Sequence, residues 1–436
     1  MYLSTIGRPA QAGDAAPQPR QRRLALVGGN VLALGTVSLI TDVSAEMVSA
    51  VLPLYLVLGL QLGPAAYGAL DGLYTGATAV LRVVGGFVAD RIRARKLLAG
   101  LGYGISALAK LGLLAAGRST AAIGLVIAVD RMGKGVRTAP RDALITLSTP
   151  PGALGRAFGV HRAMDSVGAF LGPLVALAVL AAAGESYDAV FVTSFCVAAL
   201  AVVVLVLFVR DRREPAAAAT GAAGRAPAVT VREAAGLLRA RPVRRLVAAA
   251  CLLGLATVGD GFVYLLLQRR EELGVVWFPL LAVGTSLAYL LLAAPLGLLA
   301  DRVGRLPVLV GGYAALALVY LLLHGPLGGW PLLALVLGLY GLFYAASDGI
   351  LMALAGPVLP ARLRTTGIAL VQTGQALAYL VSSVLFGVAW QLWGPVTATR
   401  VAAVGVVLAV AGTVFLLAGA PRADAVGSET AEGTIR

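Results

Sequence analysis

Charged side chains interrupt several apolar stretches that are long enough to cross a lipid bilayer. An ionisable group in the hydrocarbon core costs about 3 kcal/mol or more, so each of these residues is a candidate for a functional role. The candidates are Asp42, Glu46, Asp130, Arg131, Lys134, His161, Asp165, Asp260 and Asp348. Their chemistry favours proton binding and charge recognition. We expect no catalytic residue and no metal site.

Sequence spacing places some of these residues on common helix faces. Asp42 and Glu46 are four residues apart, and residues at this spacing are neighbours on a helix. His161 and Asp165 have the same spacing. A carboxyl group removed from water holds a proton more readily, and a nearby arginine or cationic substrate would favour its release. We therefore expect a polar cavity in which Asp42, Glu46 or Asp165 binds a proton.

A structural role is the alternative for these charges. Acidic groups on the first and fifth helices would then neutralise a basic stripe on the fourth helix, formed by Lys134, Arg137 and Arg141. This explanation suits a single residue better than the whole set, because a purely structural bundle could use apolar residues instead. We expect Lys110, in the third helix, to be paired or to extend toward the interface.

Hydropathy predicts the helices that must position these groups. The chain has 436 residues, of which 59% are hydrophobic and 13% charged, whereas about a quarter of a soluble domain is charged. Apolar stretches of about 20 residues recur along it. We expect membrane helices at 30–60, 66–88, 96–116, 121–147, 156–182, 189–209, 246–268, 276–300, 306–323, 330–354, 365–392 and 397–417.

Two short basic segments lie about half a chain apart. GFVADRIRARKLL occupies 86–98 and GLLADRVGRLPVL occupies 297–309, an offset of 297 − 86 = 211 residues. A second pair of similar segments lies at 140–159 and 347–367. Such a duplication predicts two equivalent halves. We therefore expect an all-α integral membrane protein with twelve transmembrane helices in two pseudo-symmetric halves of six.

The two basic segments resemble the loop signature of the major facilitator superfamily of transporters. The second copy is complete, with Gly297, Asp301, Arg302, Gly304 and Arg305. The first copy has Gly86, Asp90 and Arg91 but departs from the signature at Arg93 and Ala94. The resemblance implies a secondary transporter that works by alternating access, commonly as a monomer. We expect it to need no cofactor.

The resemblance also implies a gating role for the aspartates of this signature. In the family, each aspartate sits against the N-terminus of a helix in the other half. Carried over, Asp90 would face the start of the eleventh helix near Thr365, and Asp301 would face the start of the fifth near Gly155. The helix dipole favours a carboxylate there, so each contact would hold the cytoplasmic side shut.

Two further features resemble the family's antiporters. The fifth helix contains Gly168, Gly172 and Pro173, similar to their Gly-Pro motif, although Leu177 stands where a small residue is usual. Glycines permit close helix contact and proline bends a helix. Arg131 resembles the fourth-helix arginine that is linked to proton coupling. The Gly-Pro motif, placed in the fifth helix, favours export over import.

The distribution of basic residues predicts the orientation. Basic residues gather in one set of loops, which the positive-inside rule places in the cytoplasm together with both termini, in a cell-membrane protein. The formal charge of +14 has the same explanation, so we expect no nucleic-acid partner. The expected segments are an N-terminal segment at 1–23, a first half at 24–209, a linker at 210–245, a second half at 246–419 and a tail at 420–436.

Proton-coupled export of a small organic molecule, such as a drug or metabolite, is the function that these features favour most. The alternative is a proton-coupled importer or a uniporter for a polar or anionic solute, which the basic stripe and the incomplete Gly-Pro motif favour. A polytopic membrane enzyme is a third class. The sequence lacks the His/Asp or acidic constellation at a membrane edge that such enzymes usually need, and it lacks a nucleotide-binding loop.

Overall fold

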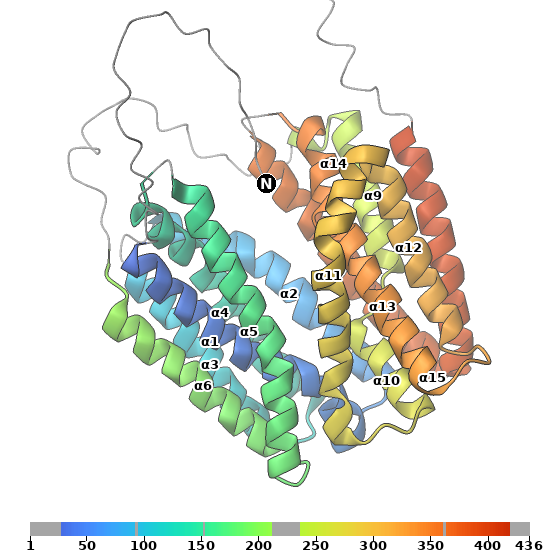
Figure 1. The fold of residues 1–436 in the computed structure, drawn as a ribbon, viewed down its shortest axis with the longest axis horizontal. Coiled ribbons are helices and arrows are strands. Elements are labelled where there is room, and N and C mark those ends of the chain that lie inside the picture. Colours follow the sequence, from blue (N-terminus) through green and yellow to red (C-terminus); the bar gives the residue numbers. More distant parts are fainter. Residues whose placement is uncertain (1–27, 92–94, 151–152, 212–235, 361–362, 419–436) are drawn as a thin grey trace, which may run out of the picture.

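The computed structural model of this chain describes residues 28–91, 95–150, 153–211, 236–360 and 363–418. Within these ranges the chain consists of helices and connecting turns, without β-strands. The helices form two bundles that stand side by side, one from each half of the sequence (Figure 1).

Six helical spans form the first half. The first span begins as α1 (Gly29–Leu54) and ends in a π-helical turn, η1 (Tyr55–Gly59), directly after Pro53. The other five spans are α2 (Pro64–Arg91), α3 (Arg95–Ala115), α4 (Thr120–Leu147), α5 (Leu154–Ala182) and α6 (Tyr187–Phe208). Serine caps begin α4 and α6, because the hydroxyls of Ser119 and Ser186 accept hydrogen bonds from backbone N–H groups of the first turn.

The second half is built in the same way but with interrupted helices. Its elements are α9 (Arg241–Ala256), α10 (Asp260–Arg270), η3 (Val275–Trp277), α11 (Pro279–Val303), α12 (Arg305–Leu322), α13 (Gly329–Ser347), α14 (Ile350–Val358) and α15 (Arg364–Ala418). The long α15 contains two spans, which meet at the non-helical Gly394.

The helix lengths and compositions are those of a membrane protein. Nine helical spans of the described residues are long and apolar enough to cross a bilayer, and one of them, Thr366–Leu417, contains the two spans of α15. The more polar α2 and α4 complete the expected twelve. Large apolar side chains, such as Leu207, Leu321 and Leu408, are exposed on the outside, as lipid contact requires. The expected all-helical, twelve-helix fold is confirmed.

Two helices that the sequence predicts to be continuous are broken. The expected helix at 246–268 is interrupted between Ala256 and Asp260, and the expected helix at 330–354 is interrupted at Asp348 and Gly349. Gly349 has φ 76°, a conformation that glycine adopts at little cost. Hydropathy does not detect such breaks, because a window of about 20 residues averages the few polar residues and glycines at the break with their apolar neighbours.

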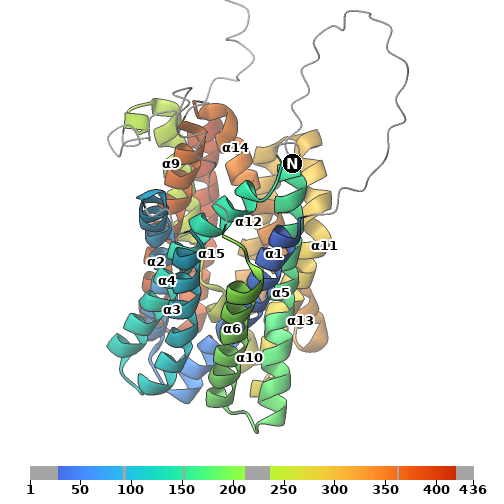
Figure 2. The same ribbon diagram turned by 90° about the vertical axis from the view of Figure 1, so that its left-hand side faces the viewer.

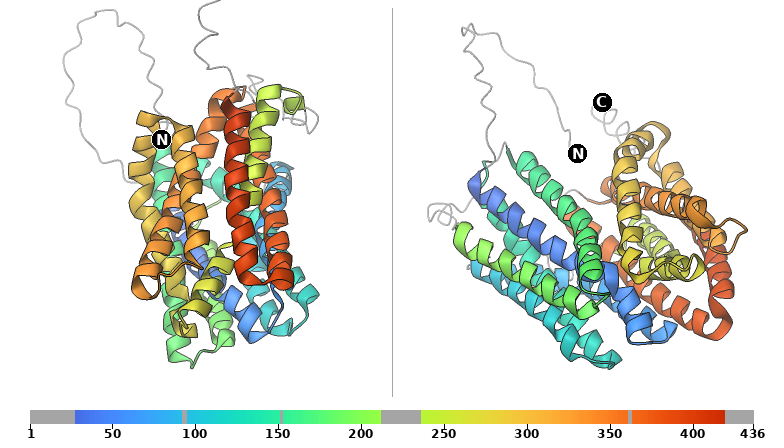
Figure 3. Two further views of the ribbon diagram at one scale, coloured as in Figure 1. Left: turned by 90° about the vertical axis from the view of Figure 1, so that its right-hand side faces the viewer. Right: turned by 60° about the horizontal axis from the view of Figure 1, so that its bottom comes forward.

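The two halves meet at one end and separate toward the other. We name the end where α6 ends and α9 begins the linker end (Figure 1). At the opposite end α2 packs closely on α15. A Cβ atom at Gly72 would lie 2.8 Å from the carbonyl oxygen of Leu380, and one at Gly387 would collide with the carbonyl of Pro64. Small residues thus allow the halves to touch there. Figure 2 shows the outer face of the first half, and Figure 3 shows that of the second.

The predicted Gly-Pro motif of α5 packs against α1. A Cβ atom at Gly172 would lie 2.8 Å from the carbonyl oxygen of Val43, and one at Gly168 would collide with the carbonyl oxygen of Leu39. Pro173 lies inside α5, which continues to Ala182. The glycines therefore hold α1 and α5 together within the first half, where α1 carries Asp42 and Glu46.

Candidate functional site

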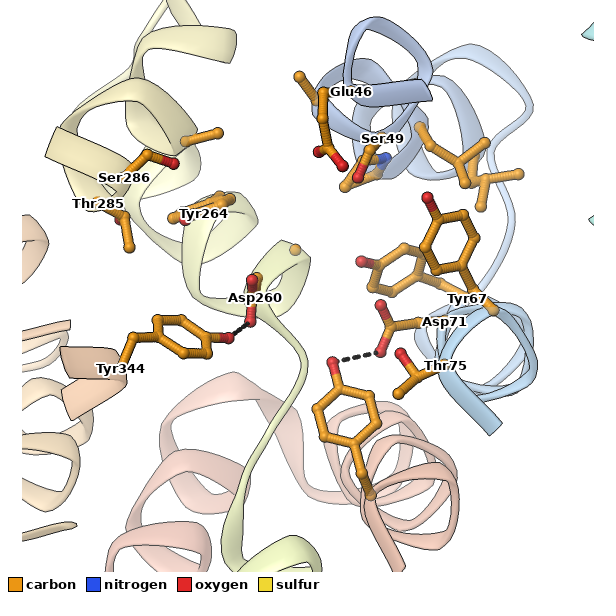
Figure 4. Close-up of a pocket in the computed structure, with 18 of the residues that line it drawn as sticks. Glu46, Ser49, Tyr67, Asp71, Thr75, Asp260, Tyr264, Thr285, Ser286 and Tyr344 are labelled. Carbon is orange, nitrogen blue, oxygen red and sulfur yellow. Dashed lines mark hydrogen bonds between the residues drawn. The ribbon is translucent and has the colours of Figure 1, made fainter. Parts of the chain in front are cut away.

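A cavity of about 410 Å³ lies between the halves, near the middle of the bundle, and is named here the deep chamber (Figure 4). Residues of α1 and α2 line one side, and residues of α10, α11, α13 and α15 line the other. Its ionisable lining consists of four carboxyl groups and six tyrosines, which are Glu46, Asp71, Asp260, Asp348, Tyr67, Tyr74, Tyr264, Tyr289, Tyr344 and Tyr379. Among the described residues, no lysine, arginine or histidine lines this chamber.

Asp260 stands at the helix break and faces the deep chamber from the second half. Its Oδ1 atom accepts hydrogen bonds from the hydroxyl of Tyr340, at 2.9 Å, and from that of Tyr344. Asp260 is the first residue of α10, so its carboxylate lies at the positive end of a helix dipole. Within the break, the backbone N–H of Val258 donates to the Tyr320 hydroxyl at 2.8 Å. This bond satisfies a backbone group that the helix no longer pairs.

Asp71 faces the same chamber from the first half, and the sequence reasoning missed it. Its Oδ2 atom accepts hydrogen bonds from Ser383 and, at 3.3 Å, from Tyr379, both on α15 of the second half. A Cβ atom at Gly259 would collide with the Asp71 carboxylate, so Asp71 lies against the break before α10. The signal was present, since Asp71 is an acidic residue inside the apolar run 66–88.

Glu46 lies near the middle of the 31-residue span Gly29–Gly59. Figure 4 shows its carboxyl group beside Ser49, facing the chamber across from Thr285 and Ser286 of α11. No lysine or arginine of the described residues forms an ion pair with it. Glu46 thus presents to the chamber a carboxyl group that no described basic side chain neutralises by direct contact.

A second cavity, of about 700 Å³, continues from the deep chamber toward the linker end and is named here the vestibule. The two cavities share Tyr74, Thr75, Asp260, Tyr344, Asp348 and Tyr379. Only the vestibule is lined by Arg131 and Lys134 of α4. Asp348 is exposed there and accepts a hydrogen bond from Tyr289 at 3.2 Å. The chamber is therefore acidic, whereas the vestibule carries both signs of charge.

The structure places Asp130 in a network inside the first half rather than between the halves. Its Oδ1 atom accepts a hydrogen bond from Ser106 and lies 3.4 Å from the Lys110 ammonium, and its Oδ2 atom pairs with Arg131. The Arg131 guanidinium in turn lies 3.8 Å from the centre of the Tyr74 ring, which lines the chamber. Lys110 is therefore paired, which is one of the two roles that the sequence predicts for it.

Asp42, His161 and Asp165 lie apart from both cavities, in the contact between α1 and α5. His161 is 1% exposed, and its Nε2 atom lies 3.5 Å from the Asp165 carboxylate. A Cβ atom at Gly168 would lie 3.2 Å from the Cβ atom of Asp42, which places Asp42 at the same helix contact. That these residues bind a proton stays a prediction. If they do, the proton binds outside the chamber and the vestibule.

The residues of the loop signature lie at the linker end. In the first copy, Gly86, Asp90 and Arg91 belong to the last turns of α2, and their side chains lie outside the described residues. In the second copy, Asp301 and Arg302 are exposed at the end of α11, and Gly304, with φ 98°, joins α11 to α12. Arg305 donates a hydrogen bond of 2.5 Å to the carbonyl oxygen of Ala353 in α14. Gly297 lies two turns earlier in α11.

No metal-binding constellation is found in the part of the chain that the structure describes. Groups of three or more histidine, cysteine, aspartate or glutamate side chains that could hold one ion are absent there. The two cysteines, Cys196 and Cys251, are free thiols on different helices.

The sequence matches the family described as Major Facilitator Superfamily over residues 34–285 and 270–434. This chain belongs to the major facilitator superfamily. As a member it is a secondary transporter of a small molecule and not an enzyme. An uncharacterized MFS-type transporter of Methanocaldococcus jannaschii is 29% identical over 370 residues, which are 83% of this chain and 89% of that protein. An uncharacterized protein of Mycobacterium tuberculosis is 36% identical over 162 residues, 36% of this chain and 38% of that one.

Solved transporters share the fold of this superfamily member. A variant of the nucleoside transporter NupG superposes with a TM-score of 0.75 at 16% identity, over 88% of this chain and 99% of NupG. A POT family transporter in complex with 5-aminolevulinic acid gives 0.72 at 13% identity, over 91% of this chain and 97% of that one. A bacterial homologue of Spinster, solved in an inward-facing and occupied conformation, gives 0.66 at 14% identity, over 88% and 96%. At these identities the similarity concerns the fold alone.

Proposed function

We propose that this transporter is a proton-coupled exporter of a small organic molecule, which it binds in the deep chamber. The observation that carries the proposal is the convergence of carboxyl groups from both halves on one cavity. Glu46 and Asp71 face the chamber from the first half, and Asp260 faces it from the second. A transport site between two halves that rock about it is accessible from each side in turn.

Like charges on facing walls supply a physical basis for coupling. Asp71 lies against the helix break that ends at Asp260, so these two carboxylates repel each other across the boundary between the halves. Closing the halves further removes water and strengthens that repulsion. A proton on one carboxyl group, or a bound cation, removes it. The return of the halves is therefore expected to require a proton when no substrate is bound.

The distribution of basic residues supports an orientation with the linker end in the cytoplasm. Arg95, Arg241 and Arg305 begin α3, α9 and α12 at the linker end. The opposite end carries few basic residues, Arg118, Arg400 and the pair Arg269 and Arg270, which is followed by two glutamates. By the positive-inside rule, both termini of this cell-membrane protein would lie in the cytoplasm, and the vestibule would open on the cytoplasmic side.

The test is proton movement in proteoliposomes that enclose a pH-sensitive dye. With an imposed pH gradient, addition of a transported compound should release or consume protons inside, and Glu46→Gln should abolish that signal. Asp188→Asn is the matched control, since Asp188 is an exposed carboxylate at the start of α6 and lies outside both cavities. Transport by the unaltered protein without any proton movement would refute coupling.

Import or uniport of a polar or anionic solute is the second candidate, and Lys134 favours it. Lys134 lines the vestibule and forms no ion pair with a described residue, so it could attract an anion from the linker end. Measurements of substrate accumulation in whole cells distinguish export from import. Export should lower the accumulation of a substrate in expressing cells relative to cells without the protein, whereas import should raise it.

A further inference from the structure

We propose that the deep chamber selects an organic cation, a molecule with an ammonium or other onium group on a flat or apolar body. The inference rests on the proposed function in one respect, that the deep chamber is the transport site, and it adds the class of substrate. Three properties of the chamber lead to it, namely its charge, its aromatic walls and the position of its nearest bases.

The charge of the chamber is of one sign. Four carboxyl groups line it, from α1, α2, α10 and the turn after α13, and no described basic residue lines it with them. Asp71 and Asp260 already accept hydrogen bonds from hydroxyl groups, and such donors satisfy an ionised carboxylate. The hydroxyls do not neutralise the charge. A cation would do so at the position where the carboxylates of the two halves converge.

Tyrosine rings form much of the remaining wall. Six of them line the chamber, and three donate their hydroxyls to its carboxylates, which are Tyr289, Tyr344 and Tyr379. The ring of Tyr67 is held edge-to-face against Phe262, with centroids 4.7 Å apart. Aromatic faces attract onium groups by cation–π interaction and pack well against flat apolar bodies. A chamber of about 410 Å³ is of the size that small organic ligands occupy.

The nearest bases lie outside this chamber. Arg131 is paired with Asp130, which it shares with Lys110, and is stacked on Tyr74. Lys134 lines the vestibule and not the chamber. An anion in the chamber would meet carboxylates on both walls, and a neutral polar molecule would leave their mutual repulsion uncompensated. An onium group between Asp71 and Asp260 would instead draw the halves together.

Equilibrium binding to the purified full-length transporter tests the inference. The radiolabelled probes are the cations tetraphenylphosphonium and phenyltrimethylammonium. Triphenylphosphine oxide is the neutral competitor. The anion tetraphenylborate, close in shape to the first cation, is assayed on its own because the two ions precipitate together. We expect saturable binding of a cation that triphenylphosphine oxide does not displace, and no saturable binding of tetraphenylborate. Glu46→Gln and Asp260→Asn should each weaken it by at least about tenfold, since each removes a charge from the chamber. Asp188→Asn should leave it unchanged, and Lys134→Met should strengthen it by removing a nearby positive charge.

Either of two results would overturn the inference. One is that neither cation shows saturable binding. The other is that cation binding is unchanged in Glu46→Gln and in Asp260→Asn. Each variant is first checked for a single symmetric gel-filtration peak, which shows that it is folded. Proton-coupled flux of a neutral compound, without cation binding, would refute the cation inference and leave the proposed function intact. Cation binding and transport without proton movement would refute proton coupling and leave the inference intact.

Discussion

At the scale of single residues, the charges of α4 divide into groups paired inside the first half and groups that line a cavity. Asp130 is bound by Ser106, Lys110 and Arg131 on α3 and α4, so it anchors a base rather than contacting the transport cavities. Lys134, one turn further, lines the vestibule. The sequence spacing of Asp130 and Lys134 could not distinguish these two roles, because both residues belong to the same polar region of α4.

The Asp130 network predicts a large effect of Asp130→Asn on stability. The substitution leaves Lys110 and Arg131 buried without their acid, and removal of one partner of a buried ion pair costs about 3–5 kcal/mol. We expect a clearly lower unfolding temperature in detergent. The double variant Lys110→Met/Asp130→Asn restores the net charge of the cluster and should recover part of the loss. An Asp130→Asn protein as stable as the unaltered one would contradict the role assigned to this network.

At the scale of elements, broken and closely packed helices shape the site. The break before α10 makes Asp260 the first residue of a helix, beside the chamber. In an unbroken helix, the backbone groups at this position would be hydrogen-bonded within the helix. Glycines of α2 let that helix approach α15 at the opposite end from the linker. The first feature forms the binding wall, and the second permits the halves to close around it.

Two glycine substitutions distinguish the effect of close helix packing from the effect of backbone strain. Gly72→Ala would place a Cβ atom 2.8 Å from the carbonyl oxygen of Leu380, so the halves could no longer close fully at that end. Gly349→Ala meets no atom within 4 Å, but its φ of 76° costs an alanine about 1–2 kcal/mol. We expect Gly72→Ala to slow transport at least about tenfold with the fold retained, and Gly349→Ala to lower the unfolding temperature with transport largely kept. Equal initial rates for the two variants in proteoliposomes would rule out the packing explanation.

At the scale of the whole molecule, the cavity system faces the linker end while the opposite end is closed. The vestibule reaches the first turns of α15 through Ala369 and Gln372, whereas Pro64 and Gly387 touch at the other end. The loop signature lies at the linker end, where its aspartates would meet helix starts of the other half only when that end closes. Its aspartates are therefore expected to act on the conformational equilibrium and not on the ligand.

This gating role predicts that Asp90→Asn abolishes transport but not membrane insertion. The amide lacks the charge that a helix N-terminus in the other half would attract, so the conformation closed at the linker end loses stability. Initial transport rates in proteoliposomes, beside the amount of inserted protein, are the measurement. Asp188→Asn again serves as the control. Normal transport by Asp90→Asn would refute the gate.

The sequence determined the fold because the signals for it are local. Each apolar run long enough to cross a bilayer became a helical span, two of them interrupted, often within a residue or two of its predicted bounds, as in 121–147 against Thr120–Leu147. The repeated basic segments, 211 residues apart, predicted two halves, and the loop signature predicted the superfamily. These properties depend on stretches of neighbouring residues, which the order of the chain shows directly.

Tertiary structure alone decided which charges meet. Glu46 lines the chamber whereas Asp42, one turn away on α1, does not, although both lie against glycines of α5. Asp71 and the tyrosines join the site because two helix bundles bring α2, α10 and α15 together. Contacts between residues some 300 positions apart depend on which face each helix turns toward its neighbours and on where helices are broken. Hydropathy averages over a whole helix and therefore shows neither. The sequence therefore predicts the bundle, and the packing of its halves selects the site.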